Sequence, residues 1–595
     1  MKRSKLLYIL LMVLVLASAA FARRPKRTVI RSVEIEGTRV YKPQQLYPAM
    51  LGRPSRLLYR KFYNSEILLQ DLRSLELYYQ QRGFLEAKVE DHKVEIDSVK
   101  RQARIFIRIT EGERTHIEAV NLLGNMAVSD SVLLGLITVK AGDPLRRKNI
   151  ENSNLALMRY YADRGYLDAE IVPEIKVKAG THLALVDFVI AEKEQFRVNS
   201  VIIQGLEKTR ENVVVRELSF HSGEVINYSR LMESQRKLYL TGLFSSVFIR
   251  PAIPGGKIAG TKDALIEVKE NKYGEFNVSI GYGTIDQLRG KMEVFYTNLR
   301  GRGQKIGFAS KLSFIERGVE ISFTEPWTFA TRWRTDLNLS TEFLNQPGYD
   351  LLQSGGRATV GRSIDKRSSA TITYRYEDFR LSHIRVAAIP DEMKSNIRSL
   401  KLALKYDTRD NLFATKSGCY IEWSNELAGT ILQGLNSFYR TNLELKYFYS
   451  PSSSLTFGSG IDLGWISAAE GIASVSLNER YYAGGPNVMR SFRYQRLGPL
   501  DSAGIPTGGI YKTVWNVIEM RKAVYKGLGL ECFLDAGNVW DRKASIRMTT
   551  LENAVGLGIR YDSPIGLVRV DYAVRIYPRS GIESGLWYLS MGQSF

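Results

Sequence analysis

An alternation of apolar and polar or small residues recurs from Lys272 to the C-terminus, and this feature most constrains the fold of the chain. In the segments 276–282, 400–406 and 568–576 every second residue is apolar. A period of two places successive side chains on opposite faces of a β-strand, so these segments predict strands with one apolar face. A soluble sandwich also alternates, but charged residues such as Arg569 on the second face suit a wide polar lumen.

After residue 22 no run approaches the ~18–20 apolar residues that a transmembrane helix needs. The chain is therefore either soluble outside the cytoplasm or a closed barrel, the other structure that satisfies every backbone group in lipid. At roughly 20 residues per strand and turn, residues 272–595 accommodate on the order of 16 strands. The sequence predicts a transmembrane antiparallel β-barrel over this region.

Residues 1–22 have the pattern of a secretory signal peptide: a basic start, an apolar stretch over residues 6–17 and the small-x-small sequence AFA at residues 20–22. An uncleaved anchor helix is the alternative, but the apolar run is short for a span. We expect a mature chain that begins at Arg23. Cys419 and Cys532 lie far apart, which indicates isolated strand residues and no disulfide framework.

The net charge of +21 and the pI near 9.6 imply an anionic neighbour. Export excludes nucleic acid as a partner. Acidic lipid or lipopolysaccharide headgroups of the outer membrane remain.

Between about residues 29 and 271 the sequence repeats itself three times, with a period of about 80 residues. Each repeat has a strand that ends in glycine, then a helix that ends at a second glycine, then a strand that ends in glutamate. The first glycines are Gly37, Gly124 and Gly205; the helix-ending glycines are Gly83, Gly165 and Gly242; the glutamates are Glu111, Glu192 and Glu270. The spacing of Leu68, Leu72, Leu75 and Tyr79 fits one face of a helix, so each repeat predicts an α+β module with helices on one side of a sheet.

Residues suited to catalysis are scattered. The histidines occur singly, and neither His-Glu-x-x-His nor Gly-x-Ser-x-Gly is present; they are His92, His116, His182, His221 and His383. We therefore predict no enzyme, no metal site and no cofactor.

The three repeats resemble polypeptide-transport-associated (POTRA) domains, which the resemblance places at residues 23–113, 114–194 and 195–271. It implies periplasmic modules that offer a sheet edge to extended polypeptides, in the way that a peptide adds a strand to an exposed edge. The alternative is a spacer that binds nothing.

Several motifs in residues 272–595 occur in a characteristic order. They are NLRGRGQ at 298–304, TEPW at 324–327, YDTRDN at 406–411, FLDAGNVW at 533–540, GIRYDSPIG at 558–566 and a last strand that ends in Phe595. In this order and after three modules, they resemble the outer-membrane protein assembly superfamily, which includes BamA, TamA and the two-partner secretion transporters. The terminal aromatic also resembles the recognition signal of bacterial outer-membrane barrels.

The stretch 479–492 is too irregular for a strand, because the Gly-Gly-Pro run at 484–486 forbids a regular ladder. The resemblance makes it the sixth extracellular loop, which folds into the lumen and carries an Arg-Gly-Phe motif. Here the motif is Arg490-Ser491-Phe492. If the torsion angles of glycine are needed, the backbone of Ser491 is strained or the tip is arranged differently.

The resemblance also implies partners for the loop arginine on the lumen wall. Phe533 and Asp535 are two residues apart and share a face of one strand, and Glu519 lies on the preceding strand. A guanidinium between two carboxylates and a ring has charge-assisted hydrogen bonds and a cation–π contact available. We expect Arg490 to lock the loop to these three residues; the alternative is that the charges line a wet lumen.

For function, the resemblance implies a barrel that closes poorly between its first and last strands, so that a client strand can pair with the exposed edge. The seam residues are Phe276, Val278, Ile280, Trp587, Leu589, Met591 and Phe595. Glycines nearby (Gly281, Gly283, Gly585 and Gly592) weaken pairing or face a crowded lumen.

The sequence thus predicts an insertase for unfolded outer-membrane protein clients, with its barrel in the bacterial outer membrane and its modules in the periplasm. Three modules resemble the TamA-like arrangement more than the five usual in BamA, and a central assembly role remains open. A TamB-like or other periplasmic partner is expected on the first module. A two-partner-secretion-type transporter is the alternative, and a passive porin a third.

Overall fold

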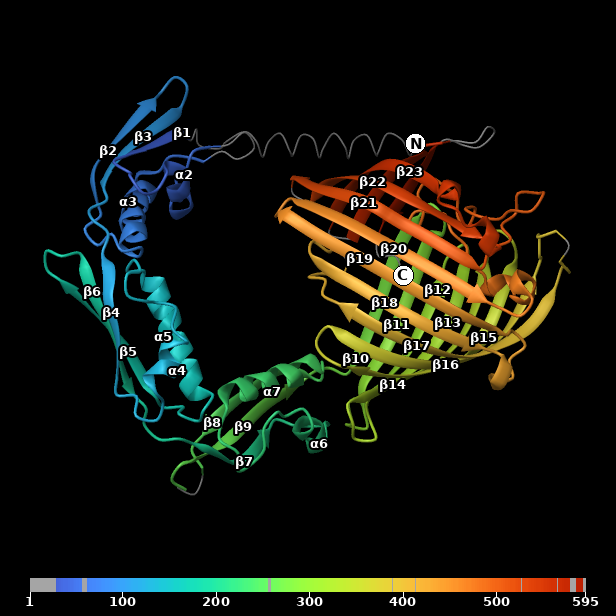
Figure 1. The fold of residues 1–595 in the computed structure, drawn as a ribbon, viewed down its shortest axis with the longest axis horizontal. Helices are drawn as coiled ribbons and strands as arrows, with labels where there is room; N and C mark the ends of the chain where they lie inside the picture. Colours follow the sequence, from blue (N-terminus) through green and yellow to red (C-terminus); the bar gives the residue numbers. More distant parts are fainter. Residues whose placement is uncertain are drawn as a thin grey trace, which may run out of the picture. The chain divides into compact units, whose positions relative to one another are not determined.

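The computed structural model describes residues 28–55, 61–254, 258–387, 389–412, 414–525, 527–563, 566–577 and 585–591. The expected signal peptide, Gly592 and Phe595 lie outside the described residues. Three α+β repeats are followed along the chain by a β-barrel (Figure 1), as the alternation and the repeat pattern predicted. No helix in the described part of the chain is both long and apolar enough to cross a membrane.

Each repeat contains a three-stranded sheet in which the last strand lies in the middle, with the orders β1-β3-β2, β4-β6-β5 and β7-β9-β8. The first strand of each repeat runs parallel to the middle strand. The first repeat comprises β1 (Val29–Glu36), α2 (Pro43–Leu46), η1 (Tyr47–Ala49), α3 (Ser65–Gln80), β2 (Lys88–Asp97) and β3 (Gln102–Thr110). The second comprises β4 (His116–Leu123), α4 (Asp130–Leu134), α5 (Arg147–Ala162), β5 (Glu170–Lys178) and β6 (Leu183–Ala191). The third comprises β7 (Arg197–Gln204), α6 (Glu211–Val215), α7 (Tyr228–Leu240), β8 (Phe244–Ala252) and β9 (Thr261–Glu270).

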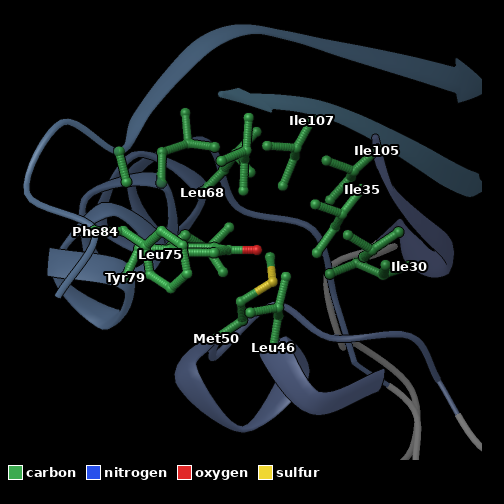
Figure 2. Close-up of a cluster of buried hydrophobic side chains, with 14 residues drawn as sticks. Ile30, Ile35, Leu46, Met50, Leu68, Leu75, Tyr79, Phe84, Ile105 and Ile107 are labelled. Atoms are coloured by element: carbon green, nitrogen blue, oxygen red, sulfur yellow. The ribbon is translucent and has the colours of Figure 1, made fainter. Parts of the chain in front are cut away.

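The core of the first repeat lies between helix α3 and its sheet. Leu68, Leu75 and Tyr79 of α3 point toward Ile105 and Ile107 of β3 (Figure 2), and all are buried. The helix begins where the side chain of its N-cap residue accepts hydrogen bonds from the first free amides. Burial of each large apolar side chain contributes roughly 1.5–3 kcal/mol, so the predicted apolar stripe is what holds α3 to the sheet.

The glycine after the first strand is required in every repeat. Gly37, Gly124 and Gly205 adopt φ angles of 83°, 92° and 90°. A Cβ atom on Gly37 would lie 2.0 Å from the carbonyl oxygen of Ile109, and on Gly205 2.0 Å from that of Val268. Both the left-handed backbone and this close approach exclude a side chain, so the repeated glycines mark one structural position.

The glutamate that ends each repeat holds the loop after the first strand. Its carboxylate accepts hydrogen bonds from backbone amides of that loop; donor–acceptor distances are 3.2 Å from Val40 to Glu111, 2.9 Å from Ala127 to Glu192 and 2.7 Å from Thr209 to Glu270. In the first two repeats a tyrosine hydroxyl (Tyr79 or Tyr161) donates to the same carboxylate at 2.8 Å. Burial, together with this bond, raises the pKa of both tyrosines.

The barrel consists of sixteen strands, β10 to β25, which pair in chain order and close into a ring. They are β10 (Gly274–Gly283), β11 (Gln287–Leu299), β12 (Gln304–Leu312), β13 (Glu316–Thr328), β14 (Trp333–Asn345), β15 (Asp350–Ser363), β16 (Ser368–Ser382), β17 (Met393–Asp407), β18 (Gly418–Ala428), β19 (Phe438–Ser452), β20 (Leu455–Ser467), β21 (Tyr511–Tyr525), β22 (Leu528–Trp540), β23 (Glu552–Ser563), β24 (Gly566–Arg575) and β25 (Gly585–Met591). Neighbouring strands are antiparallel. The number of strands agrees with the sequence prediction.

The two faces of the wall differ as the alternation predicted. On β17, Leu400, Leu402 and Leu404 are exposed on the outside. On β24, Asp571 is buried on the inside, while Tyr572 is exposed on the outside. An apolar outer face and a charged inner face are the arrangement of a barrel that spans a membrane.

Candidate functional site

The connection between β20 and β21, residues 468–510, folds into the barrel. It contains η3 (Gly471–Ser474) and η4 (Leu477–Glu479). Met489 and Phe492 are buried in one hydrophobic cluster with residues of five wall strands; these are Ile397, Phe438, Ile466, Val539 and Ala554. The tip of the loop therefore lies in the lumen.

The Gly-Gly-Pro run gives the tip its shape. Gly484 and Gly485 have φ angles of 108° and 113°, in the region that favours glycine. The amide of Gly485 donates to the carbonyl oxygens of Phe492 at 2.9 Å and Met489 at 3.2 Å, which closes the tip on itself. Ser491 does not adopt a positive φ, so serine at this position carries no left-handed strain.

Arg490 lies at the centre of the lumen contacts. Its Nε and Nη2 donate to the two carboxylate oxygens of Asp535, each at 2.9 Å, and its guanidinium stacks 3.2 Å from the centroid of the Phe533 ring. Nη1 lies 3.7 Å from a carboxylate oxygen of Glu519. The structure thus brings together Arg490 and the three wall residues that the sequence singled out.

Glu531 is a fourth partner that sequence reasoning missed. Arg490 Nη1 donates to Glu531 Oε1 at 2.7 Å, which is shorter than its distance to Glu519. Glu531 shares the luminal face of β22 with Phe533 and Asp535, since it precedes them at the same period of two. The sequence contained this signal, because Glu531 lies two residues before Phe533 in the same alternation.

Two further arginines complete the cluster. Arg521 Nε and Arg560 Nε donate to Glu519 and Glu531 respectively, and Arg560 Nη2 also donates to Glu519 at 3.3 Å. We call the Arg490 cluster the set Arg490, Glu519, Arg521, Glu531, Phe533, Asp535 and Arg560. Its three arginines balance its three carboxylates, so the buried charges are paired.

Arg521 also connects the cluster to the end of the barrel that lies opposite the β20–β21 connection. Its Nη1 donates to the carbonyl oxygen of Thr415 at 3.3 Å. Thr415 belongs to the connection between β17 and β18, and its hydroxyl donates to the carbonyl oxygen of Asn411 at 2.6 Å. The YDTRDN motif therefore lies in a segment that reaches toward the Arg490 cluster.

A second ionic anchor holds the start of the loop. Glu479 accepts from Arg375 Nη2 at 3.1 Å and from Arg440 Nη2 at 2.9 Å. Both arginines also donate to Glu426, at 2.9 and 3.1 Å. These contacts join the loop to β16, β18 and β19, and no sequence spacing indicated them.

The last strands hold the other side of the tip. The Arg575 guanidinium stacks 3.7 Å from the centroid of the Phe492 ring. The hydroxyl of Tyr588 on β25 donates to the carbonyl oxygen of Phe492. Arg569 Nη2 donates to Asn487 Oδ1 at 2.8 Å. The loop is thus tied to the strand that closes the barrel.

The barrel closes between β10 and β25, and the described part of β25 ends at Met591. Within the described residues these two strands form two ladder pairs, Tyr282 with Met591 and Gly283 with Ser590, against seven for β24–β25 and ten for β10–β11. Thr284 adds a backbone hydrogen bond to Leu589 at 3.0 Å. The described part of the seam is therefore held by few backbone hydrogen bonds.

Six of the seven expected seam residues lie on these two strands, and Phe595 lies outside the described residues. Phe276, Val278 and Ile280 are exposed on β10, and Trp587 and Leu589 are exposed on β25. Nearby glycines are crowded: a Cβ on Gly281 would lie 2.9 Å from the carbonyl oxygen of Met591, and one on Gly585 2.5 Å from the Tyr572 hydroxyl. Close approach accounts for these glycines.

The NLRGRGQ and TEPW motifs lie at the end of the barrel at which strand β10 begins. There they contact the segment Gly205–Glu217. The amide of Arg210 donates to the carbonyl oxygen of Gly301 at 2.9 Å, and Trp327 Nε1 donates to Glu217 Oε1 at 2.7 Å. A Cβ on Gly301 would lie 2.1 Å from the carbonyl oxygen of Lys208, so glycine is required there. These motifs therefore have a structural role outside the lumen.

Two known families together match most of the chain from residue 28 onward. The Omp85 superfamily domain matches residues 298–595. The POTRA family, described as a surface antigen variable number repeat, matches residues 28–112, 115–193 and 196–271.

Individual relatives are distant but extend over most of the chain. The outer membrane protein assembly factor BamA of Nitratidesulfovibrio vulgaris is 25% identical over 591 residues, which cover 95% of this chain and 73% of the relative. BamA of Neisseria meningitidis serogroup B is 24% identical over 638 residues, covering 96% and 78%. The crystal structure of BamA from Haemophilus ducreyi lacking POTRA domains 1–3 has a TM-score of 0.68 at 19% identity, and covers 80% of this chain and 99% of that one.

Proposed function

Because this chain belongs to the Omp85 superfamily, we propose that it is an outer-membrane protein assembly factor that inserts β-barrel clients into the bacterial outer membrane. Its barrel spans that membrane and its three POTRA domains lie in the periplasm. Proteins that are similar to nearly the whole of this chain are named BamA assembly factors. This similarity favours the insertase over the secretion transporter.

The observation that carries the mechanism is that β10 and β25 form two ladder pairs within the described residues, which end at Met591. A client strand in the membrane needs partners for its amides and carbonyls, because each unsatisfied group costs several kcal/mol in hydrocarbon. The edge of β10 offers such partners once β25 separates from it. The client strand lengthens the sheet hydrogen bond by hydrogen bond, and no covalent chemistry is needed.

The Arg490 cluster sets the state of the loop during this process. Arg490, held by Asp535, Glu531 and the Phe533 ring, locks the loop in the lumen. The bond from Tyr588 to Phe492 joins the locked tip to β25. A seated loop thereby stabilises the last strand of the seam, and a displaced loop releases it.

The POTRA domains receive clients before insertion. The outer strands β2 and β5 each pair with one neighbour, so their free edges offer backbone groups to an extended polypeptide. A TamB-like or other periplasmic partner docks on the first POTRA domain, and outer-membrane lipid or lipopolysaccharide surrounds the barrel. The role is non-enzymatic.

Depletion in the native bacterium, followed by quantification of the outer-membrane proteome, tests this function. A broad fall in barrel proteins is expected for a central assembly factor, and the loss of a few barrels for a specialised one. Intact barrels with one missing exoprotein would instead establish the secretion transporter.

A further inference from the structure

A hollow of about 740 Å³ lies over strands β12 to β16 of the barrel wall. Its lining includes small residues of β15 and, from β13, β14 and β16, the large apolar side chains of Val319, Ile321, Leu337, Leu339, Tyr374 and Tyr376. On β16, Arg375 binds the luminal loop through Glu479, so the odd-numbered residues there face the lumen. Tyr374 and Tyr376 therefore face outward, and the hollow opens on the membrane side.

The register of the strands explains the hollow. Gly356 pairs with Leu339 on one side and with Tyr376 on the other. Ala358 pairs in the same way with Leu337 and Tyr374. Because Gly356 and Ala358 carry no large side chain, a groove remains between the leucines of β14 and the tyrosines of β16.

The depth of the groove follows from the chain direction. Because β10 begins on the periplasmic side, the connection between β16 and β17 is extracellular. Outward residues close to that connection are charged and exposed, namely Asp378, Arg380 and Lys394. The groove adjoins this charged level, because Tyr376 lies two residues from Asp378 on the same face of β16. Acyl chains are the main material available there to fill an apolar groove.

A cationic group stands at the extracellular end of the groove. Arg398 pairs with Tyr376 across the strands, and its guanidinium lies 5.2 Å from the centroid of that ring. Its Nε is buried and has no hydrogen-bond partner within the described residues. By contrast, Arg380 is already paired with Glu392 at 2.6 Å. The side chain of Arg398 is half-buried and makes no ion pair within the part of the chain that the structure describes, so its two remaining guanidinium nitrogens are placed to receive an anionic headgroup.

We propose that this groove binds one acyl chain of an anionic outer-leaflet lipid whose phosphate rests on Arg398. The two tyrosines and the leucines of β14 contact the chain, and the small residues of β15 form the floor. The site lies away from the β10–β25 seam and is distinct from the surface where a client strand pairs.

Native mass spectrometry of the full-length protein in detergent tests this proposal, with equal amounts of phosphatidylglycerol, phosphatidylethanolamine and lipid A offered. We expect one retained lipid per protein and about fivefold preference for the anionic lipids over phosphatidylethanolamine. Arg398→Gln is expected to abolish the preference. Whether phosphatidylglycerol or lipid A dominates identifies the lipid; either supports the site.

Two variants fill the groove. A Cβ on Gly356 would lie 3.0 Å from Cδ2 of Leu339, a flexible group, so Gly356→Leu is accommodated and occupies the groove. Ala358→Leu fills it independently. Each should lower lipid retention about tenfold, as expected when about two methylenes lose their contacts. Val555→Leu, on the exposed outer face of β23, is the matched control and should retain lipid normally.

Unchanged retention in both filled variants would overturn the proposal, as would a wild-type protein that retains no lipid. A dimer that dissociates in the filled variants would also overturn it, because a second copy would then occupy the groove. An unchanged lipid preference in Arg398→Gln would overturn the headgroup assignment.

Discussion

The hydroxyl of Tyr588, on the last strand of the barrel, donates a hydrogen bond of 2.5 Å to the carbonyl oxygen of Phe492 at the tip of the luminal loop. Both residues are buried. One hydrogen bond therefore joins the two parts of the proposed mechanism, the loop that occupies the lumen and the strand that closes the seam.

Tyr588→Phe should remove this connection and leave the ring in place. The loss of a buried neutral hydrogen bond costs about 1 kcal/mol and leaves the Phe492 carbonyl with the Gly485 amide as its donor. We expect faster hydrogen exchange along β25 and a lower temperature of heat modification on gels. Tyr561→Phe, on the outer face of β23, is the control. Equal exchange of β25 in both variants would argue against the connection.

Arg490→Ala should destabilise the folded barrel strongly. Removal of one partner from a buried ion pair costs roughly 3–5 kcal/mol, because Asp535 loses its cationic partner and Glu531 keeps only Arg560. The measurement is the heat-modification temperature together with protease cleavage of the loop. If Glu531 stabilises the loop through Arg490, the double variant Glu531→Gln with Arg490→Ala will lose less stability than the sum of the losses in the two single variants. Additive effects, or a fully stable Arg490→Ala, would contradict the lock.

Arg521→Gln should release the connection between β17 and β18 from the Arg490 cluster. The side chain then loses its bond to the Thr415 carbonyl and its charge beside Glu519. We expect larger and more frequent openings in single-channel recordings. Lys522→Gln removes the same charge from the neighbouring residue, which contacts Ser454. Indistinguishable recordings from the two variants would show that the contact of Arg521 with Thr415 does not restrict the lumen.

A disulfide across the seam should block insertion. Tyr282 pairs with Met591, and antiparallel pairs bring Cα atoms to about 4.5–5.5 Å, within reach of a disulfide. Both can be changed to cysteine after replacement of Cys419 and Cys532 by alanine. We expect oxidised protein in liposomes to fail to insert a client barrel, and reduction to restore insertion.

The control for that experiment is a disulfide within the sheet. Val278 pairs with Met292 across β10 and β11, so cysteines at these positions bridge two strands without closing the seam. This variant should insert clients in both redox states. Full insertion by the oxidised seam variant would rule out passage between β10 and β25.

Acid should weaken the third POTRA domain through Glu270. Burial disfavours its charge, but hydrogen bonds from Tyr273 and from the Thr209 amide outweigh burial and lower the pKa of Glu270 from 4.5 to about 2. A lowered folded-state pKa gives stability that is present above about pH 4.5 and is lost as the pH falls toward 2. Since Glu270 is half-exposed, we expect about 1–2 kcal/mol.

The measurement is the unfolding of the periplasmic region of the full chain by urea at pH 6 and pH 3. Glu270→Gln removes the charge and should reduce the difference between the two pH values by that amount. An equal pH dependence in wild type and variant would contradict the assignment.

The fold could be predicted because its signals are local. The period of two along each strand and the helical spacing in α3 are read from neighbouring residues, and both matched the structure. The contacts of Arg490 with Phe533 and Asp535 came from strand parity joined to a family resemblance. Glu531 follows from the same parity and was overlooked.

Other parts of the site depend on contacts that no local pattern encodes. Glu479 meets Arg375 and Arg440, which lie on strands far away in the sequence. Their charges alone gave no reason to prefer these pairs over many others. The pairing of Tyr282 with Met591 and of Gly283 with Ser590 depends on strand register, which alternation leaves undetermined.

The equal number of arginines and carboxylates in the Arg490 cluster has an electrical consequence. While the loop is seated, the charges of the cluster cancel. When Arg490 leaves, the wall keeps two arginines and three carboxylates, and so acquires one net negative charge. An emptied lumen would then favour cations, and its field would draw the arginine back. Displacement of the loop would thus create an electrostatic attraction that favours its return.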